Sequence, residues 1–322
     1  MTGPLGIVAV MRNSAIAVSG LRKGYGDKVV LDGIDFDVAA GSVFSMLGPN
    51  GAGKTTTVNV LTTLMKADGG TVHVAGHDVV TATKEVRSLI GVTGQFAAVD
   101  ELLTGRENLQ LMADLKRVRS ADRVVARLLE RFDLVKSADK AASTYSGGMR
   151  RKLDLAMTLV GNPQIIFLDE PTTGLDPRSR RTMWEIVRDL VADGTTIFLT
   201  TQYLEEADQL ADRIAVLDQG RIVAQGTPEE LKRQIPGTHV RLRFTDLFEL
   251  DAAAQVLAGA TRDDQELTLR VPSDGGSRSL RALLDRLDDH MISAEEFSVH
   301  TPDLDDVFFA LTGHTSTEAI AK

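Results

Sequence analysis

The distribution of apolar residues in the middle of the chain predicts a parallel β-sheet. Residues 43–47, 165–168 and 196–199 form short, largely continuous apolar runs, which are typical of parallel strands buried on both faces. Residues 178–190, between the second and third of these runs, repeat apolar positions with a helical period. A strand, a helix and a further strand in this order predict an α/β domain with a parallel sheet at its core.

Two other patterns accompany this predicted core. Residues 16–18 and 34–38 alternate apolar and polar side chains on either side of a turn at residues 24–27, and this alternation predicts an antiparallel β subdomain. Residues 106–134 combine a helical period with many charges. We therefore expect a helical subdomain over about residues 96–160.

The pattern changes at residues 235–238, where Ile-Pro-Gly-Thr interrupts it. Beyond this break, strand-like and helical segments alternate along the rest of the chain. We expect one large domain at residues 14–235 and a small accessory α+β domain at residues 236–322, with a disordered extension at residues 1–13. The residues leave three roles open for the accessory domain, namely regulation, contacts within a dimer and ligand binding.

The composition argues against several classes of protein. The 322-residue chain carries a net charge of −9, which disfavours broad electrostatic attraction to nucleic acid. It contains no cysteine, so it has neither disulfides nor thiolate metal sites. No stretch reaches the roughly 18 apolar residues of a membrane-spanning helix, and the first residues lack the basic and apolar regions of a signal peptide. We expect a cytoplasmic globular protein.

A glycine-rich segment links the apolar run at residues 43–47 to a helical pattern. It consists of Gly48, Pro49, Asn50, Gly51, Ala52, Gly53, Lys54, Thr55 and Thr56. The glycines let successive backbone N–H groups converge on phosphate oxygens at the start of the helix. Lys54 is placed to reach the β- and γ-phosphates, and the Thr55 hydroxyl to ligate Mg²⁺. A simple glycine-rich turn is the weaker alternative, because a strand precedes the segment and a helix follows it, so we predict a nucleoside triphosphate site.

Two acids end the apolar run at residues 165–168 and supply a second chemical feature. Asp169 is suited to holding Mg²⁺ through its water shell. Glu170 lies one residue further, where it can accept a proton from a water that attacks the γ-phosphate. The alternative is an edge strand that ends in solvated acids, and the continuous apolar run and the Pro-Thr-Thr-Gly-Leu-Asp at residues 171–176 argue against it.

A third feature is Tyr-Ser-Gly-Gly-Met at residues 145–149, followed by a helical pattern at residues 153–160. Ser146, Gly147 and Gly148 would form the N-terminus of this helix, which suits an anion. Taken alone, the segment is an ordinary helix cap. Its position shortly before the strand that ends in Asp169 and Glu170 makes the combination of the two segments diagnostic.

Together these segments resemble the nucleotide-binding subunit of an ATP-binding cassette (ABC) transporter over about residues 16–231. The matches are Walker A at residues 48–56, the Q-loop at Gln95, the signature at Ser146, Gly147 and Gly148, Walker B at residues 165–170, and the D-loop with Asp176. The resemblance implies the P-loop NTPase fold of such a domain. It also implies ATP and Mg²⁺ as cofactors, with the metal held by Thr55, Gln95 and Asp169.

The same resemblance implies how the site is completed. Tyr25 occupies the position where the family stacks an aromatic ring on adenine. The family forms a head-to-tail dimer, in which Ser146 and Gly148 of one copy cover the ATP that is held by Lys54 of the other. The catalytic residues implied are Lys54, Glu170 and Gln202.

Two residues depart from the usual family pattern. Met149 replaces the glutamine that ends the signature, and Gln202 stands where most members have a histidine. Glutamine can donate a hydrogen bond to the γ-phosphate but cannot titrate. We interpret Gln202 as a residue that positions the reacting groups, with a surface glutamine that caps the following helix as the alternative.

These departures, and the segments at residues 200–214 and 302–312, resemble the daunorubicin/doxorubicin-resistance type of drug-export ATPase. This resemblance covers nearly the whole chain. It implies an ATPase that energises efflux of a drug-like or hydrophobic compound through a permease on a separate chain, at the cytoplasmic face of the membrane. Lipid, polysaccharide or peptide cargo stays open as an alternative, as does, with less support, a soluble ABC ATPase that acts on ribosomes or DNA.

Overall fold

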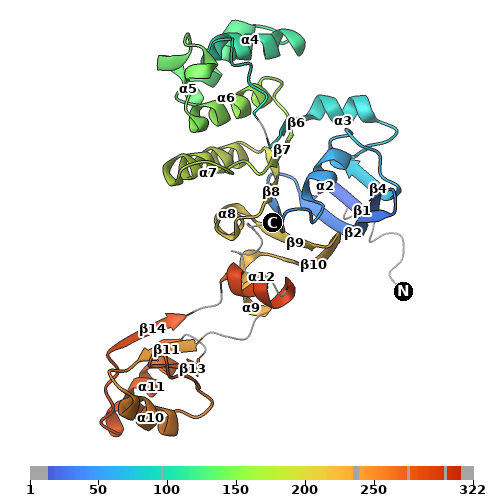
Figure 1. Cartoon of the computed structure of the whole chain (residues 1–322). Helices are drawn as coiled ribbons and strands as arrows, with labels where there is room; N and C mark the ends of the chain where they lie inside the picture. Colours follow the sequence, from blue (N-terminus) through green and yellow to red (C-terminus); the bar gives the residue numbers. More distant parts are fainter. Residues whose placement is uncertain (1–13, 96, 235–238, 274–275, 301–302, 313–322) are drawn as a thin grey trace. The chain divides into compact units, whose positions relative to one another are not determined.

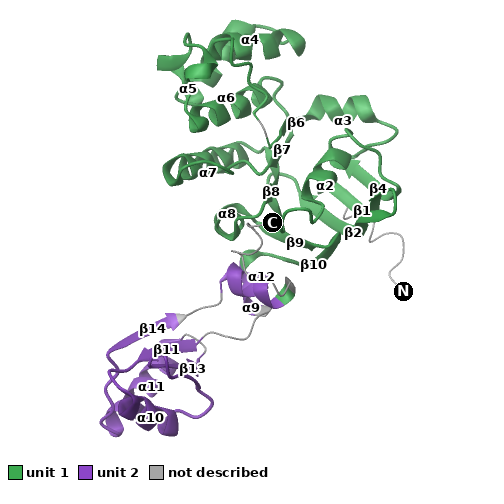
Figure 2. Ribbon diagram, viewed as in Figure 1, with its two compact units in different colours: residues 1–228, 311–322 green, residues 229–310 purple. Residues whose placement is uncertain are grey.

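The computed structural model describes residues 14–95, 97–234, 239–273, 276–300 and 303–312. It divides into two compact units, which are residues 1–228 with 311–322 and residues 229–310 (Figure 2). Helix α9 (Pro228–Gln234), which we assigned to the large domain, falls almost entirely in the second unit. The extension expected at residues 1–13 lies outside the described residues.

A six-stranded sheet forms the centre of unit 1, in the order β10-β9-β3-β8-β7-β6. Its strands are β3 (Val43–Leu47), β6 (Ile90–Thr93), β7 (Ile165–Asp169), β8 (Thr196–Thr201), β9 (Arg213–Asp218) and β10 (Arg221–Gly226). Neighbouring strands from β9 to β6 are parallel, and the β9–β10 hairpin is antiparallel. The predicted parallel core is confirmed, with the three apolar runs as its adjacent strands β3, β8 and β7.

Strand β7 is buried on both faces, which explains its continuous apolar sequence. Ile165 and Phe167 belong to a hydrophobic cluster that includes residues of α2 (Lys54–Leu61). Ile166 and Leu168 belong to a second cluster that includes residues of α7 (Pro177–Ala192). Because successive side chains of a strand point to opposite faces, a strand with a core on each side needs an apolar residue at each of these positions.

A four-stranded antiparallel sheet, in the order β2-β1-β4-β5, makes up the β subdomain of unit 1. Its strands are β1 (Ser14–Tyr25), β2 (Lys28–Ala39), β4 (Gly69–Val74) and β5 (His77–Asp78). The first two are longer than the alternation at residues 16–18 and 34–38 predicted. Register shifts along β1, as between Val18 and Leu21, explain the difference, because an irregular strand loses the strict alternation that identifies it.

Aromatic rings join the two sheets of unit 1. Phe36 of β2 stacks on Phe44 of β3 with 5.2 Å between ring centroids, and Phe44 stacks on Phe198 of β8 at 5.5 Å. Stacked aromatic pairs add to the free energy gained by burying their area. The antiparallel sheet is therefore packed on β3, which leads into the phosphate loop, and on its neighbour β8.

Helices α4 (Gly105–Leu115), α5 (Ala121–Arg131) and α6 (Gly147–Leu159) lie close together in unit 1 (Figure 1). The helical pattern expected at residues 106–134 is divided between α4 and α5 by a break in the chain direction. Arg117 and Ser120 have positive φ values of 52° and 59° there, which a right-handed helix cannot include. The remaining helical segments of this unit are α3 (Thr83–Leu89), α8 (Leu204–Leu210) and the short turns Val135–Ser137 and Ala142–Thr144.

Unit 2 contains a four-stranded antiparallel sheet in the order β12-β13-β11-β14. Its elements follow the order β11 (His239–Arg243), α10 (Leu247–Val256), β12 (Thr261–Asp263), β13 (Thr268–Pro272), α11 (Ser277–Asp289) and β14 (Glu296–His300). This β-α-β-β-α-β arrangement is ferredoxin-like. The short strand β12 was not predicted, because Thr-Arg-Asp carries no apolar residue.

Helix α12 (Leu304–Thr312) ends the described chain. Asp303 and Asp306 at its start bind each other's backbone N–H groups, at 3.0 and 3.1 Å. These acids therefore cap the start of the helix. No helix in the described part of the chain is long and apolar enough to cross a membrane.

Candidate functional site

The phosphate loop lies between the carboxyl end of β3 and the first turn of α2. Gly51 and Gly53 have positive φ values of 80° and 115°, which glycine adopts at little cost. A Cβ at Gly48 would come within 2.2 Å of the carbonyl oxygen of Leu217, and one at Gly53 within 2.7 Å of Leu31 Cδ2. Gly51 and Gly53 are thus required by their positive φ values. Gly48 and Gly53 are required by close packing against β9 and β2, respectively.

Lys54 turns its ammonium group back into the loop. Its Nζ donates to the carbonyl oxygens of Gly48 and Pro49 at 2.7 and 3.1 Å. It also forms an ion pair with Glu170 Oε1 at 3.2 Å, with both side chains buried. Burial lowers the pKa of Lys54, while the charges of Glu170 and Asp169 act in the opposite direction. The two catalytic residues predicted from distant segments therefore meet.

A cavity of about 370 Å³ opens beside this ion pair. Nine of the residues predicted from the sequence line it, namely Tyr25, Asn50, Gly51, Gly53, Lys54, Thr55, Thr56, Gln95 and Glu170. Tyr25 is 49% exposed, and its hydroxyl donates to Met65 Sδ at 3.0 Å. The cavity thus unites an aromatic ring, an N–H-rich loop, a buried cation and a carboxylate.

The end of β7 fixes the two acids in different ways. Asp169 is 4% exposed and accepts a hydrogen bond from Thr200 Oγ1. Glu170 has a positive φ of 49°, and its N–H donates to the carbonyl and hydroxyl oxygens of Thr200, each at 3.1 Å. A non-glycine residue in this region is uncommon and needs support from its surroundings. Thr200 of the neighbouring strand provides part of that support.

Ser146, Gly147 and Gly148 lie outside the lining of the 370 Å³ cavity. Ser146 is the N-cap of α6, where its Oγ accepts from Met149 N at 3.3 Å. A Cβ at Gly148 would come within 2.6 Å of Ser179 Oγ in α7. Within one copy of the chain, the described contacts of this segment are those of a helix cap packed closely on α7.

Asp176 and Gln202 occupy the starts of two helices. Asp176 is the N-cap of α7 and accepts from the N–H groups of Arg178 and Ser179, each at 3.0 Å. Hydrogen bonds from Ser179 lower the pKa of Asp176. Gln202 follows β8, and among the described residues its buried Oε1 has no hydrogen-bond partner. Gln202 does not line the cavity.

Several residues around the site were not predicted. Lys28 and Val30 of β2 also line the cavity, and they share one face of the strand because they are two residues apart. The turn predicted at residues 24–27 could have indicated Lys28, because the hairpin pairs this residue with Tyr25. Arg151 and Asp154 of α6 are buried, and the sequence assigned a role to neither. Arg151 donates to the carbonyl oxygens of Asp169 and Gly94, and Asp154 accepts from the N–H of Ala98.

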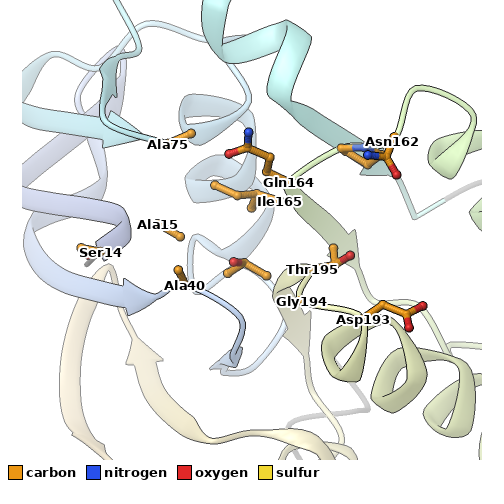
Figure 3. A pocket seen from close by; sticks show the side chains of 12 residues that line it. Ser14, Ala15, Ala40, Ala75, Asn162, Gln164, Ile165, Asp193, Gly194 and Thr195 are labelled. Atoms are coloured by element: carbon orange, nitrogen blue, oxygen red, sulfur yellow. The ribbon is translucent and has the colours of Figure 1, made fainter. Parts of the chain in front are cut away.

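A larger cavity, of about 470 Å³, lies near the amino ends of β7 and β8 (Figure 3). Its lining includes Ser14, Gln164 and Thr195, which are neutral. Its acid, Asp193, is already paired with Arg131 at 2.7 Å. Because ligands of open α/β sheets bind at the carboxyl ends of the strands, the cavity beside Lys54 is the candidate site.

Comparison with known proteins identifies the family of the chain. A family model described as ABC transporter matches residues 31–173, and one described as ATP-binding protein DrrA1-3-like, C-terminal domain, matches residues 226–312. The daunorubicin resistance ATP-binding protein DrrA3 of Streptomyces coeruleorubidus is 50% identical over 308 residues, which cover 94% of this chain and 97% of that protein. The chain belongs to the ABC transporter family. It is an ATP-binding subunit with the ATPase fold of that family, as the motifs predicted.

Other relatives place this ABC ATPase among exporter subunits. The daunorubicin/doxorubicin resistance ATP-binding protein DrrA of Streptomyces peucetius is 48% identical, with 96% of each chain covered. The Nod factor export ATP-binding protein I of Rhizobium sp. (strain N33) is 36% identical, covering 94% of this chain and 98% of its own. A solved ATP-binding subunit of an ABC transporter has a TM-score of 0.62 and 29% identity, over 69% of this chain and 93% of its own.

Proposed function

We propose that this ABC ATPase energises the efflux of a drug-like or hydrophobic compound through a permease on a separate chain. The cavity that unites Tyr25, the phosphate loop, Gln95 and Glu170 carries the ATPase part of this proposal. The near-full-length identity of 48–50% to two resistance ATP-binding proteins supports the drug-like cargo. The chain would then act at the cytoplasmic face of the membrane, held there by the permease.

The residues at the site suit the groups that ATP hydrolysis needs. The adenine would stack on Tyr25, and the N–H groups of residues 51–56 would bind the phosphates. Glu170 would accept the proton of the attacking water, and Lys54 would stabilise charge on the γ-phosphate. Gln202 would keep the reacting groups in position.

The donor set at the site also fits Mg²⁺, which prefers oxygen ligands. Thr55 supplies a hydroxyl, Gln95 an amide oxygen and the buried Asp169 a carboxylate. When bound, the ion would neutralise charge on the phosphate oxygens. Thr200, which donates to Asp169 Oδ1, would orient that carboxylate toward the ion.

We propose further that two copies pair head to tail. Ser146 and Gly148 lie outside the cavity of their own chain, yet they start a helix whose N-terminus suits an anion. A second copy would bring this segment to the ATP held by Lys54. Asp176, at the start of α7, would lie at the same interface.

Transport in membrane vesicles tests the proposal. The chain is co-expressed with a candidate permease, and inside-out membrane vesicles are prepared. ATP and a fluorescent anthracycline are added to the outer solution, which the cytoplasmic face of such vesicles contacts. We expect ATP-dependent accumulation that a Lys54→Ala variant abolishes, and ATPase activity that the drug stimulates. Export of a lipid or a polysaccharide without any effect of the drug would favour the alternative cargo. ATPase activity that is the same with and without every permease tested would refute the transport role.

A further inference from the structure

Arg151 is a buried cation to which the sequence assigned no role. It lies on α6 and is 7% exposed. Its guanidinium donates to four backbone carbonyl oxygens, namely Gly94 (2.7 Å), Pro171 (2.9 Å), Asp169 (3.2 Å) and Glu170 (3.4 Å). These acceptors belong to two segments, one just before Gln95 and the other at the end of β7. A single side chain of the signature helix thus binds both.

Asp154, one turn further along α6, completes this arrangement. Its Oδ2 lies 3.4 Å from Arg151 Nη1, and its Oδ1 accepts from the N–H of Ala98 at 3.0 Å. Both side chains are buried, and burial raises the pKa of Asp154. The Arg151–Asp154 pair therefore holds the segment around Gln95 at two points, through Gly94 and through Ala98.

The contact with the end of β7 matters because of the backbone of Glu170. Its φ of 49° lies in the left-handed region, which a non-glycine residue keeps only where neighbouring groups fix it. Thr200 binds the N–H of this residue, and Arg151 binds its carbonyl and those on either side. The direction of the Glu170 carboxylate is thus set from the sheet on one side and from α6 on the other.

We propose that Arg151 is a positioning residue, which holds Glu170 in the orientation needed to activate water and ties that orientation to the Gln95 segment and the signature helix. The inference rests on the base role proposed for Glu170. A guanidinium presents five N–H donors in a rigid fork, so it reaches four carbonyls on two segments at once. An ammonium group has three donors on one atom and cannot span them.

The test compares Arg151→Lys with Arg188→Lys as a matched control. Arg188 also donates to a backbone carbonyl, that of Gln209 at 3.1 Å, but it is exposed and lies on α7. We expect Arg151→Lys to lower kcat for ATP by about 10²-fold, the typical effect of a small misplacement of a catalytic group, with KM and the Kd for ATP within about threefold. The control should keep full turnover.

A double-mutant cycle with Glu170→Gln shows whether Arg151 acts through Glu170. If it does, Arg151→Lys costs little further turnover in the Glu170→Gln background. Additive losses would overturn the inference, as would an Arg151→Lys variant that is less heat-stable but keeps the kcat of the parent. Full turnover by Glu170→Gln alone would instead overturn the proposed base role, and the inference with it.

The variant Asp154→Asn tests the same proposal if Arg151→Lys does not fold. It keeps the size of the side chain but removes the charge that faces Arg151. We expect faster amide hydrogen exchange at Ala98 and a kcat lowered by about tenfold, in keeping with a weakened positioning contact. Unchanged exchange at Ala98 would contradict the link to the Gln95 segment.

Discussion

Replacing Glu170 by glutamine separates catalysis from stability at this site. The carboxylate accepts from Lys54 at Oε1 (3.2 Å) and from Thr173 Oγ1 at Oε2 (3.3 Å). An amide of the same size can keep its oxygen toward Lys54 and turn its NH₂ group toward the Thr173 hydroxyl, which also accepts. The change therefore removes a charge and a base without opening a cavity.

The two consequences differ in magnitude. A positioned general base contributes roughly 10²–10⁴ in rate, which is about 2.7–5.4 kcal/mol of barrier at 1.36 kcal/mol per decade. For stability, a hydrogen bond to a charged group is worth about 1 kcal/mol more than a neutral one. The change also leaves the buried Lys54 cation without its anionic partner, and an uncompensated buried charge typically costs about 3–5 kcal/mol. Lys54 still donates to the carbonyl oxygens of Gly48 and Pro49, so we expect the free energy of unfolding to fall by only about 1–2 kcal/mol.

Three measurements on Glu170→Gln check this reasoning. Steady-state ATPase assays should show turnover lower by at least about 10²-fold, thermal unfolding should shift by no more than a few degrees, and binding of a fluorescent ATP analogue should persist. Size-exclusion chromatography with ATP should show a stable dimer, since the trapped nucleotide stays at the interface. A variant that retains most of its turnover would refute the base role, and one that binds ATP but stays monomeric would refute the dimer.

Three further predictions concern single residues. Gln202→Ala should slow turnover by about 10²–10³-fold, the usual cost of losing a transition-state donor, with little change in ATP affinity by equilibrium titration; unchanged turnover would favour the simple capping role. Burial raises the pKa of Glu206, whose Oε1 accepts from Trp184 Nε1 at 3.1 Å. The folded chain therefore binds the carboxyl proton of Glu206 more tightly than the unfolded chain does. The contribution of this protonation to the free energy of unfolding is complete at low pH and is lost as the pH rises through the folded pKa. The melting temperature of Glu206→Gln relative to the parent should therefore rise as the pH is raised above the ordinary range of a glutamate pKa, and a difference independent of pH would contradict this account. Gly48→Ala should lower the free energy of unfolding in chemical denaturation by about 1–3 kcal/mol, because the new methyl group would overlap the carbonyl oxygen of Leu217. An unchanged denaturation midpoint would show instead that β9 moves aside at little cost.

Much of the fold could be read from the sequence because its signals are local. The continuous apolar runs that became β7 and β8 follow from burial on both faces. Prediction was weaker where the backbone departs from a regular strand or helix, because the hydrophobic pattern then loses its period of two or 3.6 residues. The irregular register of β1 and the positive φ values at Arg117 and Ser120 left no clear mark on the hydrophobic pattern. Strand β12 has no apolar residue and could not be found by that pattern at all.

The sequence by itself determined the chemistry of the site, because the phosphate loop and the acids after β7 lie in contiguous motifs whose spacing follows from strand and helix geometry. Only the tertiary structure decided which groups meet. The strand order brings Tyr25, Gln95 and Glu170 to one cavity and leaves Ser146 outside it. It also decided the role of Arg151, since its four carbonyl acceptors belong to segments far away in the chain. Backbone carbonyls have no sequence signature, so contacts with them become visible only when the chain is folded.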